Sequence, residues 1–211
     1  MLNFADIELL FARHGASQYS GEPVTQLEHA LQTAHLAEQS DADDALVTAC
    51  LLHDLGHLLN EWNPSVTDYR DRSPEGMALG LGRPGVRVPA GDTPSLRGID
   101  DTHQYFALPF LRGLLPDAVL DAIRLHVDAK RYLCQANPAY HAKLSDDSKR
   151  SLVLQGGVFD AVQAGAFLAQ PGARDAVMLR QWDDLAKQAG LGTPPLRHFL
   201  ARAGRCAAAP A

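Results

Sequence analysis

Apolar residues recur along this chain at the three- and four-residue spacing of amphipathic helices, and no segment shows the alternation typical of a strand. Start and stop signals agree, because Thr25 and Glu28 form a capping box and Gly15 ends the segment before them. A chain of 211 residues is long enough to bury a substantial core without disulfides. The sequence therefore predicts an all-α fold in one domain over residues 1–203, followed by a disordered tail over 204–211.

Capping residues place several helix starts. Asp43 or Asp44 can cap the third expected helix. Pro116 suits the first turn of the fifth, and Ser145 or Ser148 can start the sixth. In chain order, the expected helices span about 4–13, 25–39, 43–59, 100–113, 116–126, 145–155 and 174–189, with a last helix before the tail.

A long irregular insertion over about 62–98 interrupts this pattern, because it is rich in Pro, Gly, Arg and Asp and shows little periodicity. Structureless connections of this length are uncommon in compact domains and are usually lids or disordered segments. The insertion joins the helix that carries His53 to the helix that carries His103. We therefore predict a partial lid over any site that these two residues build. The alternative is a flexible insertion unrelated to activity.

Composition narrows the class of partner. The formal net charge of −6 and the absence of a basic segment argue against nucleic-acid binding and favour a small-molecule ligand. Three cysteines, Cys50, Cys134 and Cys206, form no disulfide pattern and suit reduced thiols. We find no signal peptide and no apolar run that could span a bilayer. We expect a soluble cytoplasmic protein, without a membrane partner, that acts as a monomer or a small homo-oligomer.

The segment from His53 to His57, His-Asp-Leu-Gly-His, carries the strongest functional signal. An imidazole and a carboxylate at consecutive positions can turn toward one ion, while Asp54 keeps a second oxygen for another. A single carboxylate can bridge metals that lie about 3.5–4 Å apart. Leucines surround the pair, and an unpaired carboxylate would be costly among them. The pattern predicts a metal site, and the alternative is an ordinary solvated His-Asp pair at a helix end.

Further ligands must come from the other histidines, because a two-metal site needs more nitrogen donors than one His-Asp pair supplies. His29, His53, His103 and His126 are the ligand candidates, since each lies on an expected helix. His57 follows His53 by four residues and can share its helical face. The remaining histidines, for which we expect surface or structural roles, are His14, His35, His141 and His198.

Several motifs together resemble a known family. They are His29, His53-Asp54, Tyr19-x-x-Glu22, His103, His126, Lys130, Leu144-Ser-Asp-Asp-Ser148, Gln155-Gly156-Gly157 and Leu179-Arg-Gln-Trp-Asp-Asp184. Over residues from about 5 to 200, this set is similar to the mixed-valent diiron oxygenases of the HD-domain superfamily that degrade phosphonates. The combination is specific, whereas the His-Asp dipeptide alone is common to the whole superfamily, most of whose members are phosphohydrolases.

The resemblance implies an HD-domain helical bundle that uses O2 to cleave the carbon–phosphorus bond of a 1-hydroxyphosphonate. The favoured substrate is 2-amino-1-hydroxyethylphosphonate, which would give glycine and phosphate. Two iron ions in a mixed-valent Fe2+/Fe3+ state would be the cofactor. In the ligand set that the resemblance implies, one iron takes His29, His53, Asp54 and Asp183, and the other shares Asp54 and adds His103 and His126. Asp184 competes with Asp183, and the family spacing favours Asp183.

The resemblance also implies roles around the metals. Tyr19 would occupy a position on the second iron until substrate displaces it, and Glu22 would recognise the substrate ammonium group. The phosphonate would be held by His57, Lys130 and Ser148. These roles agree with elementary chemistry, because a phosphonate dianion needs a cation and hydrogen-bond donors. Imidazole and carboxylate ligands without thiolate suit iron or manganese, although they also accept zinc.

The chain departs from the family after Gln155-Gly156-Gly157, where it continues with Val158-Phe159-Asp160. A changed pocket leaves the substituent on the hydroxylated carbon open, and the trimethylammonio analogue, which would give glycine betaine, is an alternative substrate. A second alternative is a metal-dependent phosphohydrolase acting on a nucleotide or phosphomonoester. Inositol-oxygenase-like chemistry would not need Lys130, and a regulatory module that binds a nucleotide would leave the full ligand set without a purpose.

Overall fold

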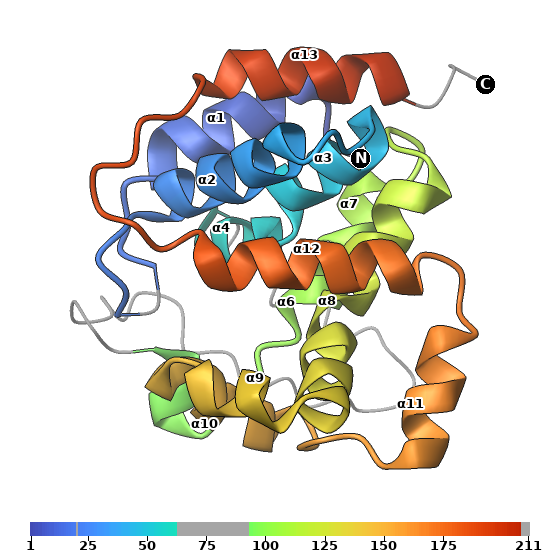
Figure 1. Cartoon of the computed structure of the whole chain (residues 1–211). Coiled ribbons are helices and arrows are strands. Elements are labelled where there is room, and N and C mark those ends of the chain that lie inside the picture. The colour runs from blue at the N-terminus through green and yellow to red at the C-terminus, as the bar shows by residue number, and fades with distance from the viewer. Residues whose placement is uncertain (20, 63–92, 208–211) are drawn as a thin grey trace, which may run out of the picture.

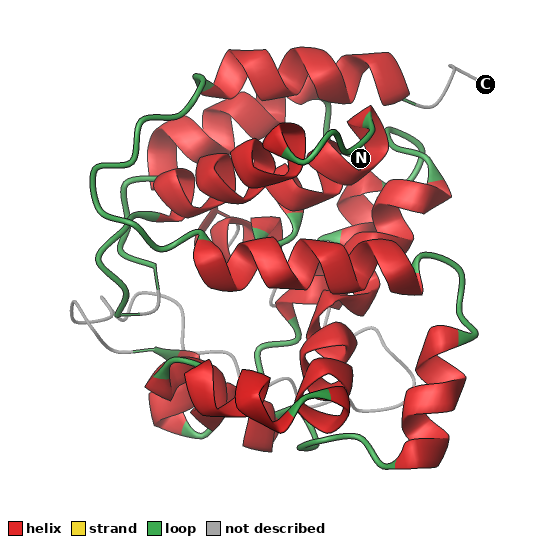
Figure 2. Cartoon of the chain, in the orientation of Figure 1, coloured by secondary structure: helices red, strands yellow, loops and turns green. Residues whose placement is uncertain are grey.

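The computed structural model describes residues 1–19, 21–62 and 93–207, and the regular elements within these ranges are all helices (Figures 1 and 2). The predicted all-α fold is confirmed. The helices are α1 (Phe4–His14), α2 (Gln26–Gln39), α3 (Asp44–Leu52), α4 (Leu55–Trp62), the 3-10 helix η2 (Pro94–Arg97), α6 (His103–Phe106), α7 (Leu108–Leu111), α8 (Asp117–Ala136), α9 (Pro138–Lys143), α10 (Asp146–Leu154), α11 (Ala161–Leu168), α12 (Ala173–Leu185) and α13 (Leu196–Cys206). None of these described helices combines the length and the apolar composition needed to cross a membrane.

Local sequence signals set the helix starts. The predicted capping box of α2 is present, because the Glu28 N–H donates to Thr25 Oγ1 at 3.2 Å and the Thr25 N–H donates to Glu28 Oε2 at 2.7 Å. Asp43 caps α3 and Ser145 caps α10, each by accepting a backbone N–H in the first turn. Side-chain caps of this kind satisfy N–H groups that have no partner within the helix.

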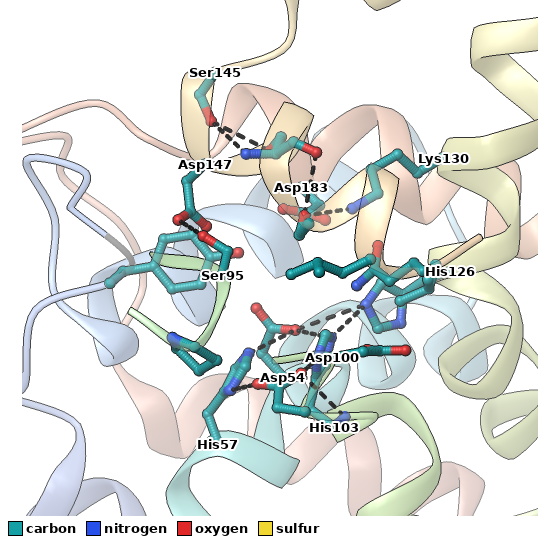
Figure 3. Close-up of a pocket in the computed structure, with 18 of the residues that line it drawn as sticks. Asp54, His57, Ser95, Asp100, His103, His126, Lys130, Ser145, Asp147 and Asp183 are labelled. Carbon is teal, nitrogen blue, oxygen red and sulfur yellow. Dashed lines mark hydrogen bonds and ion pairs between the residues drawn. The ribbon is translucent and has the colours of Figure 1, made fainter. Parts of the chain in front are cut away.

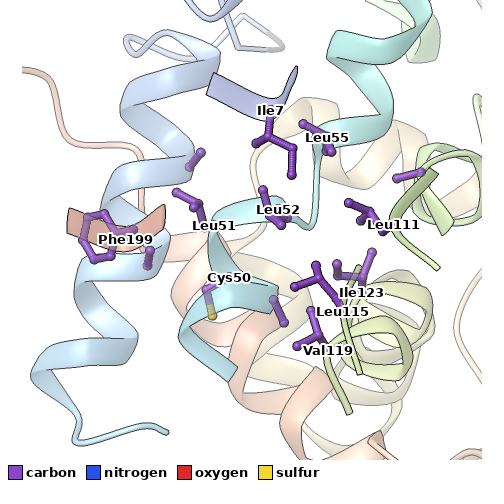
Figure 4. Close-up of a cluster of buried hydrophobic side chains, with 14 of the residues drawn as sticks. Ile7, Cys50, Leu51, Leu52, Leu55, Leu111, Leu115, Val119, Ile123 and Phe199 are labelled. Atoms are coloured by element: carbon purple, nitrogen blue, oxygen red, sulfur yellow. The ribbon is translucent and has the colours of Figure 1, made fainter. Parts of the chain in front are cut away.

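The main core surrounds α3, which packs against α2, α8 and α13, while α12 packs against both α8 and α2 (Figure 1). Every residue from Leu46 to Leu52 is buried, so α3 contacts neighbours on all sides. In Figure 4, Leu52 lies between Ile7 of α1 and Leu115, and Leu51 lies toward Phe199 of α13. A helix enclosed in this way gives its C-terminal end a fixed position in the middle of the bundle.

The predicted third helix is interrupted at the His-Asp pair, which is a correction to the sequence interpretation. The helix ends at Leu52, and α4 begins at Leu55. His53 Nδ1 donates to the Cys50 carbonyl at 2.9 Å. In a continuous helix this carbonyl would accept from the N–H of Asp54. A Cβ on Gly56 would lie 2.3 Å from the His103 carbonyl oxygen, so only glycine permits the backbone of α6 to approach this closely.

Other boundaries also differ from the predictions. The expected 100–113 helix consists of two short helices, α6 and α7, with Pro109 at the start of the second, where its missing N–H cannot continue a helical ladder. Pro116 is the N-cap of α8 and not part of its first turn. The helices α9 and α11 were not predicted, and α12 ends at Leu185, short of the expected boundary.

The two variable regions are described in part. Within the predicted insertion, Pro94–Arg97 forms a 3-10 helix that packs against α10. Residues 63–92, on which the predicted lid mainly depends, lie outside the described residues. Helix α13 continues to Cys206, so Gly204 belongs to a helix and not to the predicted tail. Residues 208–211 of that tail lie outside the described residues.

Candidate metal centre

Six predicted ligand residues from five parts of the fold converge on one buried site. Figure 3 labels Asp54, His103, His126 and Asp183 among them. Each of them is at most 8% exposed. They are His29 on α2, His53 and Asp54 at the break between α3 and α4, His103 on α6, His126 on α8 and Asp183 on α12. Because the helix is interrupted after α3, the adjacent side chains of His53 and Asp54 can both lie in the centre of the bundle.

The first group surrounds one oxygen of Asp54. His29 Nε2 and His53 Nε2 lie 3.2 Å apart, at 3.6 and 3.3 Å respectively from Asp54 Oδ2. Asp183 Oδ1 lies 3.3 Å from His29 Nε2. Atoms of His29, His53 and Asp183 lie close enough together to bind a single ion.

The second group surrounds the other oxygen of Asp54. His103 Nε2 lies 3.2 Å from Asp54 Oδ1, and His126 Nε2 lies 3.7 Å from the same oxygen and 3.1 Å from His103 Nε2. His57, predicted to bind substrate, has its Nε2 4.0 Å from Asp54 Oδ1 and its ring stacked on that of His103 at 4.3 Å. Asp54, His57 and His103 also form a cluster that could hold an ion. The carboxylate of Asp54 thus connects two candidate metal positions.

Hydrogen bonding fixes the orientation of the rings. The Nδ1 atoms of His29, His53 and His126 donate to the backbone carbonyls of Ala186, Cys50 and Ile123 at 2.9, 2.9 and 2.7 Å. A neutral imidazole that donates from Nδ1 presents a lone pair at Nε2, and such outer hydrogen bonds are typical of metal-ligating histidines. The Nε2 atoms of His29 and His53 face each other in this way at 3.2 Å, and a cation beside them would accept both lone pairs.

Two buried carboxylate oxygens support the same conclusion. Asp54 Oδ2 and Asp183 Oδ1 are buried and accept no hydrogen bond within the described part of the chain. An unsatisfied buried oxygen of this kind costs stability, and an ion bound beside it would remove the cost. Burial alone would raise the pKa of the Asp54 carboxyl, but His53 and His103 outweigh this effect and hold the pKa well below its usual range. The residues present therefore fit a metal centre.

The choice between Asp183 and Asp184 follows from a buried arginine that the sequence interpretation overlooked. Arg180 Nη1 donates to Asp183 Oδ2 at 2.7 Å, which leaves Oδ1 directed at His29. Asp184 instead accepts hydrogen bonds from Arg180 and from the hydroxyl of Tyr140. The geometry favours Asp183 as the ligand and gives Asp184 a supporting position.

Asp101 is a second residue that the sequence interpretation overlooked. One of its oxygens accepts from His103 Nδ1 at 2.8 Å, and the other lies 3.0 Å from His57 Nδ1. Burial would lower the pKa of His103, but the Asp101 carboxylate outweighs it and raises that pKa to about 10. The only signal in the sequence was an acidic residue two positions before a candidate ligand, which is common at helix starts.

A cavity of about 60 Å³ adjoins the centre and is lined by residues predicted to bind substrate. Lys130 is buried, and its Nζ donates to Ser151 Oγ at 2.8 Å. The pKa of Lys130 is lowered to about 7. Burial is the largest cause, and the positive charge of Arg180 is the next. Ser148 is also buried and lines the same cavity. Tyr19 stacks on His29 with 3.8 Å between ring centres, and burial raises the pKa of its hydroxyl well above the usual value.

Glu22 lines this cavity but already has a partner. Lys187 Nζ lies 3.4 Å from Glu22 Oε1, and both residues line the cavity. The four histidines assigned to structural or surface roles do not join either metal cluster among the described residues. His198, for example, contacts Glu38 at 2.7 Å on the outside of the bundle.

No protein-family model matches the chain. Comparison with curated proteins finds two relatives with similar names. The [1-hydroxy-2-(trimethylamino)ethyl]phosphonate dioxygenase (glycine-betaine-forming) of Leisingera caerulea is 35% identical over 191 residues, which cover 90% of this chain and 83% of the relative. The hydroxymethylphosphonate dioxygenase of Gimesia maris is 38% identical over 197 residues, which cover 93% of this chain and 84% of the relative. Similarity at this level and over this length shows that the chain belongs to the phosphonate dioxygenase family.

Proposed function

We propose that this protein is an iron-dependent oxygenase that uses O2 to cleave the carbon–phosphorus bond of a 1-hydroxyphosphonate, releasing phosphate and a carboxylic acid. The observation that carries the proposal is the buried Asp54 carboxylate, whose two oxygens lie beside separate groups of imidazoles. The names of the two relatives, both dioxygenases of hydroxylated phosphonates, support the reaction class. A diiron centre with bridging Asp54 accounts for both facts.

The ligand assignment follows the two groups. His29, His53 and Asp183 would hold one iron with Asp54 Oδ2, and His103 and His126 would hold the other with Asp54 Oδ1. His57 Nε2 lies near enough to the second position to contact whatever binds there. A mixed-valent pair of irons would supply the electrons that activate O2.

Lys130, Ser148 and His57 would bind the phosphonate. Lys130 uses one of its three N–H groups on Ser151, which leaves donors for phosphonate oxygens. Ser148 supplies a hydroxyl from the first turns of α10. His57 is held by Asp101 through Nδ1, so its Nε2 is directed toward Asp54 and the cavity. Together these groups provide the positive charge and the donors that a dianion requires.

In the free enzyme, Tyr19 would occupy the position on the second iron that the substrate takes when it binds. Its ring stacks on that of His29, and burial and the Asp54 carboxylate raise the pKa of its hydroxyl above the usual value. A protonated phenol can donate a hydrogen bond without adding negative charge beside two carboxylates. Substrate binding would then displace this hydroxyl.

The proposed reaction balances without a further reductant. One 1-hydroxyphosphonate and one O2 give the carboxylate, hydrogen phosphate and one proton. The carbon–phosphorus and carbon–hydrogen bonds break, and one new carbon–oxygen and one new phosphorus–oxygen bond form. A hydrolase at the same centre would use water and leave the carbon unoxidised.

Phosphate release by iron-loaded protein, with and without O2, tests the proposal. The substrates are 2-amino-1-hydroxyethylphosphonate, its trimethylammonio analogue and hydroxymethylphosphonate. Release from any of them only with O2, together with the matching acid, is the expected result. Release that continues without O2, or release from a nucleotide or phosphomonoester alone, would assign the protein to the phosphohydrolases instead.

A further inference from the structure

The ion pair between Lys187 and Glu22 lies on the substrate side of the metal centre. Both side chains line the cavity, and only 15% of Lys187 and 18% of Glu22 is exposed. Lys187 Nζ lies 5.9 Å from the ring centre of Tyr19, the residue stacked on His29. The lysine therefore places a positive charge at the cavity that adjoins the candidate metal centre.

The backbone around Lys187 is anchored on both sides. The preceding Ala186 carbonyl accepts from His29 Nδ1 at 2.9 Å. The following Gln188 is bound twice by Gln32 of α2, through its N–H at 3.0 Å and its carbonyl at 2.8 Å. A lysine between two fixed residues loses less freedom on forming an ion pair than a lysine on a free loop.

Glu22 is held in a similar way. Its N–H donates to the Tyr19 carbonyl at 2.7 Å, and the Tyr19 N–H donates to the Val24 carbonyl at 3.0 Å. Gly21 has a φ of 75°, which favours glycine in this turn. The turn therefore holds the carboxylate of Glu22 beside the ammonium group of Lys187.

We infer that the substrate of this protein is a 1-hydroxyphosphonate without a cationic substituent, and that the Lys187–Glu22 pair excludes cationic ones. The inference rests on the proposed function. A substrate ammonium could reach Glu22 only by displacing Lys187 or by lying beside its charge, and like charges at such distances repel. Both substrate types occur among the relatives, because one is named for a cationic substrate and the other for hydroxymethylphosphonate.

The test compares wild-type protein with Lys187→Met on three substrates: hydroxymethylphosphonate, 2-amino-1-hydroxyethylphosphonate and the trimethylammonio analogue. Two quantities are measured for each substrate. The first is kcat/KM for phosphate release, and the second is the Kd, measured by calorimetry on iron-loaded protein without O2. For the wild type we expect kcat/KM to be higher for hydroxymethylphosphonate than for either cationic substrate, by about tenfold or more. Lys187→Met frees the Glu22 carboxylate. It should raise kcat/KM for the amine-bearing substrate by about tenfold and change kcat/KM for hydroxymethylphosphonate little.

Two controls separate specificity from structure. Lys143→Met, at an exposed lysine outside the cavity, should leave the three-substrate profile unchanged. Adding Glu22→Gln to Lys187→Met should abolish the gain for the amine, because no carboxylate remains to bind it. If Lys187→Met does not fold, Lys187→Gln removes the same charge with a polar side chain of similar shape.

The outcomes for the inference and for the proposed function are distinct. A wild-type protein that prefers either cationic substrate would overturn the inference and leave the oxygenase assignment intact. Equal losses on all substrates in Lys187→Met, with a lower Tm, would show that the pair only stabilises the fold. Failure of the iron-loaded wild type to release phosphate from any of the three would reject the proposed function, and the inference with it.

Discussion

Arg180 and Asp183 form an ion pair within α12, with 2.7 Å between Nη1 and Oδ2, and both side chains are almost completely buried. The pair uses one oxygen of Asp183 and leaves the other, Oδ1, 3.3 Å from His29 Nε2 without a hydrogen bond. We therefore infer that Arg180 is a positioning residue that determines which oxygen Asp183 presents to the candidate metal centre.

Replacing Arg180 by Met should weaken metal binding in the first group by about 10- to 100-fold, because loss of an outer-shell partner has this typical effect. It should also destabilise the metal-free protein by about 3–5 kcal/mol, since it leaves a buried carboxylate unpaired. Metal titration and denaturant unfolding measure the two effects. Arg124→Met is the matched control, because Arg124 makes an ion pair with Asp121 away from the centre. Unchanged metal affinity in Arg180→Met would contradict the positioning role.

Asp54→Asn should abolish binding of both irons. Asparagine keeps the shape of the side chain but offers only one oxygen and no charge, whereas the two oxygens of Asp54 lie beside different imidazole groups. Each ion present at a hundredfold excess over its Kd would stabilise the folded state by about 2.7 kcal/mol. We expect the iron-induced rise in Tm to disappear. Asp147→Asn, at another carboxylate lining the cavity, should retain two irons. A mutant at Asp54 that also retains two would refute the bridge.

Asp101→Asn should weaken the second metal position selectively, by about 10- to 100-fold. The carboxylate accepts from His103 and lies beside His57, and an amide cannot accept from both rings with the same charge. Titration of the metal-free protein should show one unchanged and one weakened binding step. The neighbouring Asp100 also lines the cavity, so Asp100→Asn serves as the control. Equal weakening of both steps would indicate a general loss of structure.

Features that depend on residues close together in the chain could be predicted from the sequence. The capping box at Thr25 was predicted correctly because its two hydrogen bonds join residues three apart. The break after α3 was not, because it depends on the ring of His53 turning back to a carbonyl and on α6 lying against Gly56. Periodicity records which residues are apolar and gives no sign of such long-range contacts.

The same distinction applies to the site. His29 and His103 were predicted as ligands from their places on expected helices, and Asp183 was predicted from the family resemblance, since ligand types and order along the chain are visible in the sequence. Arg180 and Lys187 were overlooked as functional residues, because isolated basic residues in a helical segment are usually solvated. Their partners lie on other elements or on the buried side of α12, and only the fold brings Lys187 to Glu22 across the cavity.

Lys130 should give the enzyme a pH dependence that an arginine lacks. Its pKa in the folded protein is about 7, against 10.5 in the unfolded chain. The unfolded chain thus binds more protons between these values, and the contribution of Lys130 to stability rises with pH across that window. Phosphonate binding has the opposite requirement, because only the charged lysine attracts the dianion. We therefore expect kcat/KM to fall as pH rises through about 7.

Lys130→Arg isolates this effect, since a guanidinium stays protonated throughout. The substrate's own ionisation affects both proteins equally and cancels in the ratio of their kcat/KM values. That ratio, arginine variant over wild type, should rise with pH above about 7. Lys130→Met should lower kcat/KM by about 10- to 100-fold at neutral pH through loss of a charged hydrogen bond. A ratio that stays flat from about pH 6 to 9 would show that Lys130 remains charged in the free enzyme, and that the nearby Asp183 and Asp184 carboxylates outweigh burial and Arg180.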